Sequence, residues 1–156
     1  MYENILVTLD GSELAEGALP HMETVYKGCQ KPKVTVLRVI GPVQLPYGEA
    51  MSLISVDMIK EAELAAQKDA IKYLKGISER LGKVGITVKT EAIMGRPAET
   101  IIEYVEKNNI DLVIMSTHGR SGVGRWVWGS VADRVLHHVC TPIMLIRSPG
   151  CGLLYK

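Results

Sequence analysis

The chain of 156 residues has the length of one domain, and 47% of its residues are hydrophobic, enough for a self-supporting core. A formal net charge of +1 and an aromatic content of 5%, with no Phe, argue against nucleic-acid binding, which relies on basic surfaces and stacking rings. No signal peptide and no apolar run near the ~20 residues that span a bilayer are visible, so we expect a cytoplasmic protein without a membrane partner.

The first part of the chain predicts a strand, a helix and a second strand. The apolar run 5–9 indicates a buried strand, and Asp10-Gly11-Ser12 after it is typical of a turn that starts a helix, with Ser12 as the N-cap. Apolar residues at helical spacing then continue to about residue 26. Pro20 lies inside this pattern, and we expect a kink near residues 17–20 rather than two helices. The β-branched run 34–40 predicts the second strand.

The middle of the chain predicts a long loop, a long helix and a third strand. Residues 41–56 contain two glycines and two prolines and indicate a loop. Residues 57–82 place apolar side chains on one face of a helix, and the β pattern resumes at 87–93. Gly95-Arg96-Pro97 then begins another helix, with Pro97 near its first position.

The last part predicts two more strands around a glycine-rich segment. The run 111–115 indicates a buried fourth strand, and glycines recur from Gly119 to Gly129. Ser130 and Asp133 have the spacing of a capping box at the start of the last helix. A fifth strand follows from Pro142 to Arg147. We therefore expect one domain over residues 1–148 and a C-terminal tail over 149–156.

The alternation of apolar strands with amphipathic helices defines the fold class. Continuous apolar strands are typical of a parallel sheet that is covered on both faces. The sequence therefore predicts an α/β protein with a single doubly wound, five-stranded parallel sheet, similar to a Rossmann fold, with right-handed crossovers.

Two polar, glycine-containing loops follow the first and fourth strands, where ligands bind in such sheets. One is the Asp10–Ser12 turn, and the other begins at Ser116 and runs to Gly129 and Ser130. Glycines let the backbone approach a phosphate, and a helix N-terminus adds free N–H donors. Asp10 can accept hydrogen bonds from a ribose. The alternative is that these loops are only tight turns and helix caps.

The sequence lacks several other kinds of site. Neither a GxxxxGK[ST] phosphate loop nor a GxGxxG after the first strand is present. The three cysteines are odd in number and have no CxxC spacing, so we expect no disulfide framework and no zinc site. No clear nucleophile–base pair surrounds His118, so we expect a loop histidine or a passive ligand contact, and no catalytic residue or protein metal site is assigned.

Several segments together resemble the universal stress protein family, and they extend over essentially the whole chain. They are the runs Ile5–Ser12, Val36–Ile40, Met115–Gly122, Gly129–Leu136 and Cys140–Arg147. ATP-binding members of that family carry G-x2-G-x9-G-[ST]. Gly119 and Gly129 match the second and third glycines and Ser130 the hydroxyl, whereas Ser116 replaces the first glycine. The resemblance implies the fold of adenine nucleotide alpha hydrolases.

The resemblance also implies a site for ATP or AMP, with Mg or Mn as a companion ion. It assigns adenosine, ribose and phosphate contacts to nine residues: Thr8, Asp10, Val39, Met115, Ser116, Gly119, Gly129, Ser130 and Val131. Ser116 leaves two functions open: a nucleotide-binding regulatory protein of the stress response, or a dimeric scaffold without nucleotide. A slow ATPase is the weakest alternative, because no general base is readable.

The resemblance further implies a homodimer through the last strand, from Pro142 to Arg147. The sequence supports this pairing independently, because that strand is apolar and would be an exposed edge in a monomer. Pairing of two such edges closes a two-fold assembly.

Overall fold

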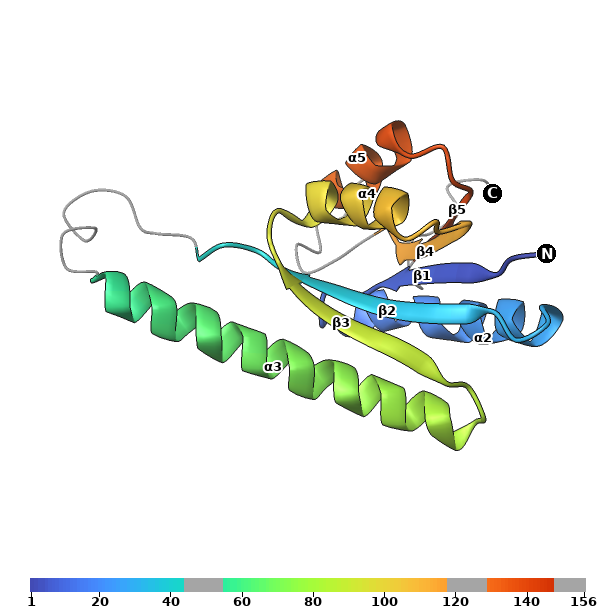
Figure 1. The fold of residues 1–156 in the computed structure, drawn as a ribbon, viewed down its shortest axis with the longest axis horizontal. Helices are drawn as coiled ribbons and strands as arrows, with labels where there is room; N and C mark the ends of the chain where they lie inside the picture. The colour runs from blue at the N-terminus through green and yellow to red at the C-terminus, as the bar shows by residue number, and fades with distance from the viewer. Residues whose placement is uncertain (44–54, 118–128, 148–156) are drawn as a thin grey trace, which may run out of the picture.

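The computed structural model describes residues 1–43, 55–117 and 129–147. A parallel five-stranded sheet of order β3-β2-β1-β4-β5 runs through its centre (Figure 1). The strands are β1 (Asn4–Thr8), β2 (Lys33–Ile40), β3 (Val88–Met94), β4 (Leu112–Ser116) and β5 (Ile143–Ile146). The predicted doubly wound α/β fold is confirmed.

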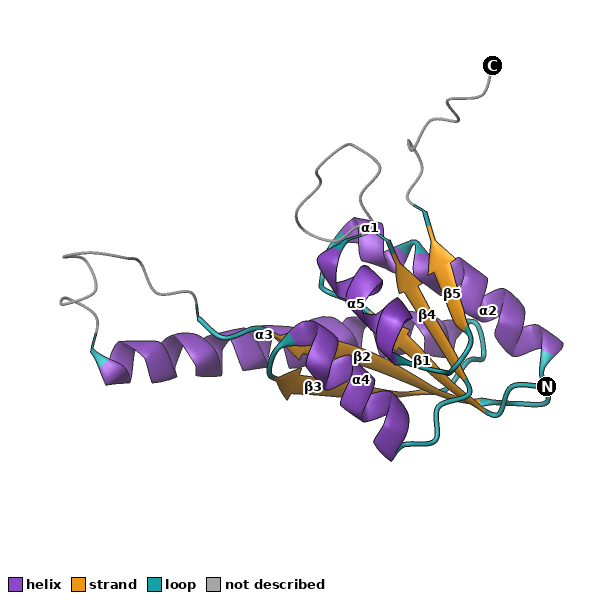
Figure 2. Cartoon of the chain, turned by 90° about the horizontal axis from the view of Figure 1, so that it is seen from above, coloured by secondary structure: helices purple, strands orange, loops and turns teal. Residues whose placement is uncertain are grey.

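Helices cover both faces of this sheet (Figures 1 and 2). The helices are α1 (Glu13–Glu16), α2 (Ala18–Gly28), α3 (Val56–Lys83), α4 (Pro97–Lys107) and α5 (Ser130–His138). The first three lie on one face and the last two on the other. As predicted, Pro97 opens α4, where its missing N–H has no intrahelical acceptor to lose.

Each face of the sheet has its own hydrophobic core. On one face, Val7 and Ile114 pack with Met22 of α2 and Leu74 of α3. On the other face, Leu6, Val113 and Met115 pack with side chains of α4 and α5, among them Ile101 and Val135. Because side chains alternate along a strand, neighbouring residues of β1 and β4 contribute to opposite cores, which is why Ile5–Val7 and Leu112–Met115 are uninterrupted apolar runs.

The structure corrects the expected kink near Pro20. Two helices meet at Gly17, whose N–H bonds to the carbonyl of Leu14 at 3.3 Å in a tighter turn than the α-helical ladder. Pro20 has no N–H to donate to the carbonyl of Glu16, so the ladder cannot run across the junction. Pro20 is instead the third residue of α2, in the first turn, where an N–H has no intrahelical partner.

The predicted capping box at Ser130 is also wrong. Gly129 is the N-cap of α5, and no side chain caps this helix by a hydrogen bond. The N–H of Asp133 donates to the carbonyl of Gly129 at 3.0 Å, so Ser130 is already the first helical residue. The predicted tail, 149–156, lies outside the described residues.

No helix in the described part of the chain is long and apolar enough to cross a bilayer. Cys29 and Cys140 are free thiols, the first half-buried and the second exposed. Cys151 lies outside the described residues.

Candidate ligand site at the carboxyl ends of the strands

The strand order creates a switch point between β1 and β4. From β1 the chain first builds outward through β2 to β3, and then crosses to the other side of β1 to add β4 and β5. The two connections that leave β1 and β4 therefore depart toward opposite faces of the sheet, α1 on one face and α5 on the other. Open α/β sheets bind ligands in the crevice at such a point.

The turn between β1 and α1 is closed by its own side chains. The Asp10 carboxylate accepts hydrogen bonds from the Ser12 N–H at 2.9 Å and from the Ser12 hydroxyl at 2.6 Å. The Ser12 hydroxyl oxygen in turn accepts the N–H of Ala15 at 3.2 Å and caps α1, as predicted. Gly11 has φ +89°, a conformation that favours glycine. Asp10 is thereby held at the carboxyl end of the central strand.

Backbone hydrogen bonds join the end of β4 to β5 and to the start of α5. The N–H of Thr117 bonds to the carbonyl of Ile146 at 2.9 Å, and the N–H of Gly129 bonds to the carbonyl of Thr117 at 2.8 Å. A β-carbon added to Gly129 would lie 2.8 Å from that same carbonyl oxygen. Thr117 and Gly129, the described residues on either side of segment 118–128, therefore meet at the carboxyl end of β4, in a contact that only glycine permits.

Three of the predicted ligand residues share one face of the sheet. Thr8 stands opposite Met115 across the β1–β4 pair, and both lie on the side of α4 and α5 with Val39 of β2. Met115 is buried and Val39 partly buried in that core. Ser116 follows Met115 and faces the opposite side, toward α1 and α2.

The first turn of α5 brings two more of the predicted residues to this edge. Ser130 and Val131 occupy its first two positions. The N–H groups of a first helical turn have no intrahelical acceptors, and the helix dipole gives this end a partial positive charge. A phosphate at this position would accept hydrogen bonds from backbone N–H groups and would be attracted by the partial positive charge of the helix end.

Eight of the nine predicted residues thus converge on one edge of the sheet: Thr8, Asp10, Val39, Met115, Ser116, Gly129, Ser130 and Val131. Gly119 lies outside the described residues, as do His118 and the rest of segment 118–128. Within the described ranges, no three His, Cys, Asp or Glu side chains gather as a metal site would require.

Arg38 is a neighbour of this site that the sequence reasoning did not select. Its guanidinium lies against Gly11, where an added β-carbon would come within 2.9 Å of Arg38 Cζ. The one charged residue within the β-branched run 34–40 was the available signal. Such a residue in a central strand needs a partner at the end of the sheet.

The described residues also form a groove at the opposite end of the sheet. It has a volume of about 450 Å³ and lies between the starts of the first three strands and the end of α4. Lys33, Thr35, Lys89 and Tyr104 are among its lining residues. It lies at the amino ends of the strands, away from the residues at the switch point, and takes no part in the candidate site.

Comparison with known proteins adds relatives along the whole domain. Residues 1–147 match the universal stress protein family. Universal stress protein MJ0531 of Methanocaldococcus jannaschii is 31% identical over 151 residues, which cover 96% of this chain and 84% of that protein. The solved structure of MJ0577 from the same organism has a TM-score of 0.81 at 27% identity, covering 96% of this chain and 99% of that one.

Two more distant solved structures share the fold and contain a nucleotide. One is a universal stress protein in complex with cAMP, with a TM-score of 0.67 and 16% identity over 95% of this chain and 98% of that one. The other is a family member from Arabidopsis thaliana with AMP bound, with a TM-score of 0.67 and 14% identity over 95% of this chain and 93% of that one.

Proposed function

Because the chain belongs to the universal stress protein family, we propose that it is a cytoplasmic regulatory protein that binds ATP or AMP and acts as a homodimer. In this proposal the protein works by binding, without catalysis, and the bound nucleotide selects which state or partner is favoured.

The observation that carries the proposal is the backbone contact between Gly129 and Thr117. It leaves no space for a side chain at the point where α5 starts, and it directs the first turn of that helix to the switch point. Asp10 is held on the neighbouring strand by two hydrogen bonds from Ser12. The proposal therefore assigns the phosphates to the N-terminus of α5 and the ribose to the Asp10 carboxylate, which lie at the same edge.

We assign the roles of the residues from the family motif, and their placement supports these roles. Asp10 accepts hydrogen bonds from the ribose, while Thr8, Val39 and Met115 form the wall on which the adenosine rests. The backbone of Gly129, Ser130 and Val131 holds the phosphates. In the family motif, Gly119 is one of the residues that contact the same phosphates. A Mg or Mn ion would accompany the phosphates and neutralise their charge. Relatives with cAMP and AMP support an adenine nucleotide, because this fold accommodates one in those proteins.

A second function, a dimeric scaffold without nucleotide, is favoured by Ser116. This residue adds a β-carbon and a hydroxyl where the family motif has glycine, at the end of β4 beside the proposed ribose. Its side chain faces α1 and α2, whereas Thr8 and Met115 face the other side. The nucleotide-binding and scaffold functions therefore differ in one measurable respect, the affinity for adenine nucleotides.

The homodimer in this proposal forms through β5. The carbonyls of Pro142 and Ile146 bond to β4, so the main-chain groups of Ile143 and Leu145 between them point to the open edge. β5 carries no charged side chain and its first three residues are half-buried. The other edge strand, β3, carries Lys89 and Glu91. Charges protect an edge from pairing, so β5 is the edge suited to a second copy.

Thermal unfolding with and without saturating ATP and magnesium tests the nucleotide. Ligand at 100 times its dissociation constant stabilises by about 2.7 kcal/mol, which is a shift of roughly 5–10 °C for a domain of this size. AMP should also shift the transition, and GTP should not. Gly129→Val should abolish the shift, because its side chain collides with the Thr117 carbonyl.

Two control variants make this test specific. Gly28→Ala adds a β-carbon that meets nothing within 4 Å and should keep the full shift. Ser116→Gly restores the family motif and should leave the shift equal or larger. If the original chain shows no shift at millimolar nucleotide and Ser116→Gly gains one, the scaffold function is the correct one. If neither protein responds, the nucleotide proposal fails.

A further inference from the structure

The guanidinium of Arg38 is clamped between the β1–α1 turn and helix α3. On one side it packs against Gly11, where a β-carbon would approach its Cζ, Nη1 and Nη2 atoms to between 2.9 and 3.1 Å. On the other side its Cζ lies 5.0 Å from the centre of the Tyr73 ring, within the range of a cation–π interaction. A planar guanidinium can make both contacts at once, one with each face.

Tyr73 is itself fixed by a second set of contacts. Its hydroxyl donates a hydrogen bond to Glu16 Oε1 at 3.0 Å, and Arg80 Nη2 donates to Glu16 Oε2 at 2.5 Å. Burial and the hydrogen bond to the Glu16 carboxylate raise the pKa of Tyr73 far above its usual value. The hydroxyl therefore stays protonated and remains a donor at any pH at which the protein works.

These contacts form a closed ring around the turn that carries Asp10. Glu16 is the last residue of α1, and Ser12 is the cap of the same helix. Ser12 is bound to Asp10, which directly precedes Gly11, and Gly11 packs on Arg38. Three elements, the β1–α1 turn, β2 and α3, are thus joined through side chains at the carboxyl edge of the sheet.

We propose that Arg38, seated on Tyr73, is a positioning residue that holds Gly11 and the Asp10 carboxylate in the arrangement the nucleotide requires. The inference rests on the proposed nucleotide function for its effect on affinity. Its structural part, the order of the turn, holds without any ligand. Arg38 acts through Gly11 and needs no contact with the nucleotide.

The chemistry of the position supports this role over simple core packing. Arg38 belongs to the same sheet face as Val36, which is fully buried, so an apolar side chain would continue the core at lower desolvation cost. Gly11 has a positive φ and no side chain of its own to fix the turn. A flat cation against its α-carbon supplies that restraint while leaving the backbone conformation intact.

The test is Arg38→Ala with chemical rescue. The dissociation constant for ATP should rise by about fivefold to thirtyfold, as expected for a loss of 1–2 kcal/mol in cation–π and packing contacts. Millimolar guanidinium should restore most of the affinity by filling the space between Gly11 and Tyr73. Ammonium at the same concentration should not, because it is not planar. Lys75→Met is the matched control: it removes an exposed cation of the same helix, α3, whose partner Glu79 lies outside the ring, and affinity should stay within about twofold.

A second measurement reads the turn without ligand. In Arg38→Ala the amide NMR signals of Gly11 and Ser12 should broaden or exchange faster, and guanidinium should reverse the change. Tyr73→Leu should reproduce the effect, while Tyr73→Phe, which keeps the ring under Arg38, should show less of it.

The outcomes separate the two proposals. Unchanged affinity and unchanged amide signals in a folded Arg38→Ala protein would overturn the positioning role. An affinity loss that guanidinium does not reverse would also overturn it, because it would indicate general destabilisation. If the original chain binds no nucleotide, the proposed function fails, and the amide signals of Gly11 and Ser12 still decide the inference.

Discussion

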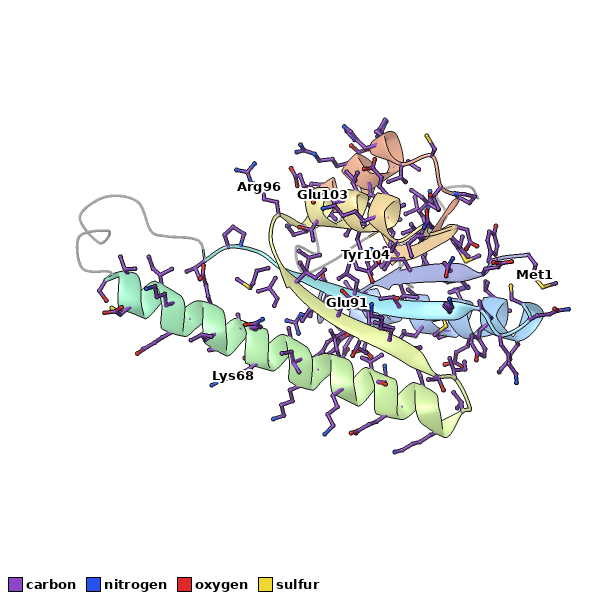
Figure 3. All side chains as sticks on the ribbon, in the orientation of Figure 1. Met1, Lys68, Glu91, Arg96, Glu103 and Tyr104 are labelled. Atoms are coloured by element: carbon purple, nitrogen blue, oxygen red, sulfur yellow. The ribbon has the colours of Figure 1, made fainter. Side chains whose placement is uncertain are left out.

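Glu91 shows how a single carboxylate on the edge strand β3 is held by two donors. Lys89 Nζ forms an ion pair with it, and the Tyr104 hydroxyl of α4 donates a hydrogen bond to Oε1 at 2.8 Å (Figure 3). Burial opposes ionisation of Glu91, but the hydrogen bonds from Lys89 and Tyr104 prevail and lower its pKa. For Tyr104, burial and the same hydrogen bond raise the pKa. The contact joins the edge of the sheet to the helix above it.

The lowered pKa of Glu91 predicts an acid-dependent loss of stability. Its contribution is complete above the unfolded pKa of a Glu, about 4.3, and disappears as the pH falls through the lower folded value. Glu91→Gln should therefore lower the unfolding free energy at pH 7 by about 0.5–1 kcal/mol, since the site is partly solvated, and the difference should vanish in acid. Urea unfolding at a series of pH values from 7 downward measures it.

Glu103 provides the matched control for this prediction. It also pairs with a lysine, Lys107, at 3.0 Å, but its side chain is 64% exposed on α4. Glu103→Gln should change the unfolding free energy at pH 7 by less than about 0.5 kcal/mol. Equal effects of the two substitutions at pH 7, or a difference for Glu91→Gln that does not shrink as the pH falls, would contradict the assignment.

The open edge of β5 is the place where the proposed homodimer can be tested. Leu145→Pro removes an N–H that points to the open edge, and leaves the β4 bonds of Pro142 and Ile146 in place. If two copies pair through β5, this substitution should convert the dimer into a monomer in sedimentation equilibrium. Leu145→Val keeps the N–H and should remain a dimer. A folded Leu145→Pro protein that stays dimeric would exclude β5 as the interface.

The strands could be predicted from the sequence because each is an apolar run with turn residues at its ends. In a doubly wound sheet both faces of the central strands are buried, so Ile5–Val7 and Leu112–Met115 have no polar interruption. The predicted bounds of β1 and β4 differ from the observed ones by one residue at each end, because strand ends depend on pairing with neighbours.

Helix ends were harder to predict because backbone contacts from elsewhere decide them. Ser130 has the right spacing for a capping box, yet the N-cap of α5 is Gly129, and Ser130 is the first helical residue. The N–H of Gly129 is held by the carbonyl of Thr117. Similarly, the break at Gly17 depends on which carbonyl its N–H reaches. Neither partner can be read from local sequence.

At the scale of the whole molecule, the edge that holds the candidate site was predictable and the ring around Asp10 was not. Carboxyl ends of parallel strands always share one edge, so the residues that end the first and fourth strands had to lie at that edge. The ring from Arg38 through Tyr73 to Glu16 includes a contact between residues 57 positions apart, Tyr73 and Glu16. This contact depends on the angle at which α3 crosses the sheet. Sequence spacing carries no information on that angle.

From the packing of the long helix α3 we expect its two halves to differ in local stability against unfolding. Its second half packs on the sheet through Ala70, Leu74, Ile77 and Leu81, whereas its first half extends past the sheet and buries no residue between 56 and 69 (Figure 1). A helical stretch of that length is marginal in water without tertiary packing. Amide hydrogen exchange should therefore show protection at least about 100-fold lower in residues 60–69 than in 74–81.

The central strand β1 sets the scale for this experiment, because its amides should exchange only through global unfolding. Residues 74–81 should approach the protection of β1, and residues 60–69 should exchange by local opening while the rest of the fold is intact. If residues 60–69 are instead as strongly protected as residues 74–81, diluting the protein distinguishes protection within one subunit from protection by a second copy. Uniform protection that persists in the monomer would contradict the prediction, whereas protection of residues 60–69 that disappears on dilution would show that a second copy covers this half of α3.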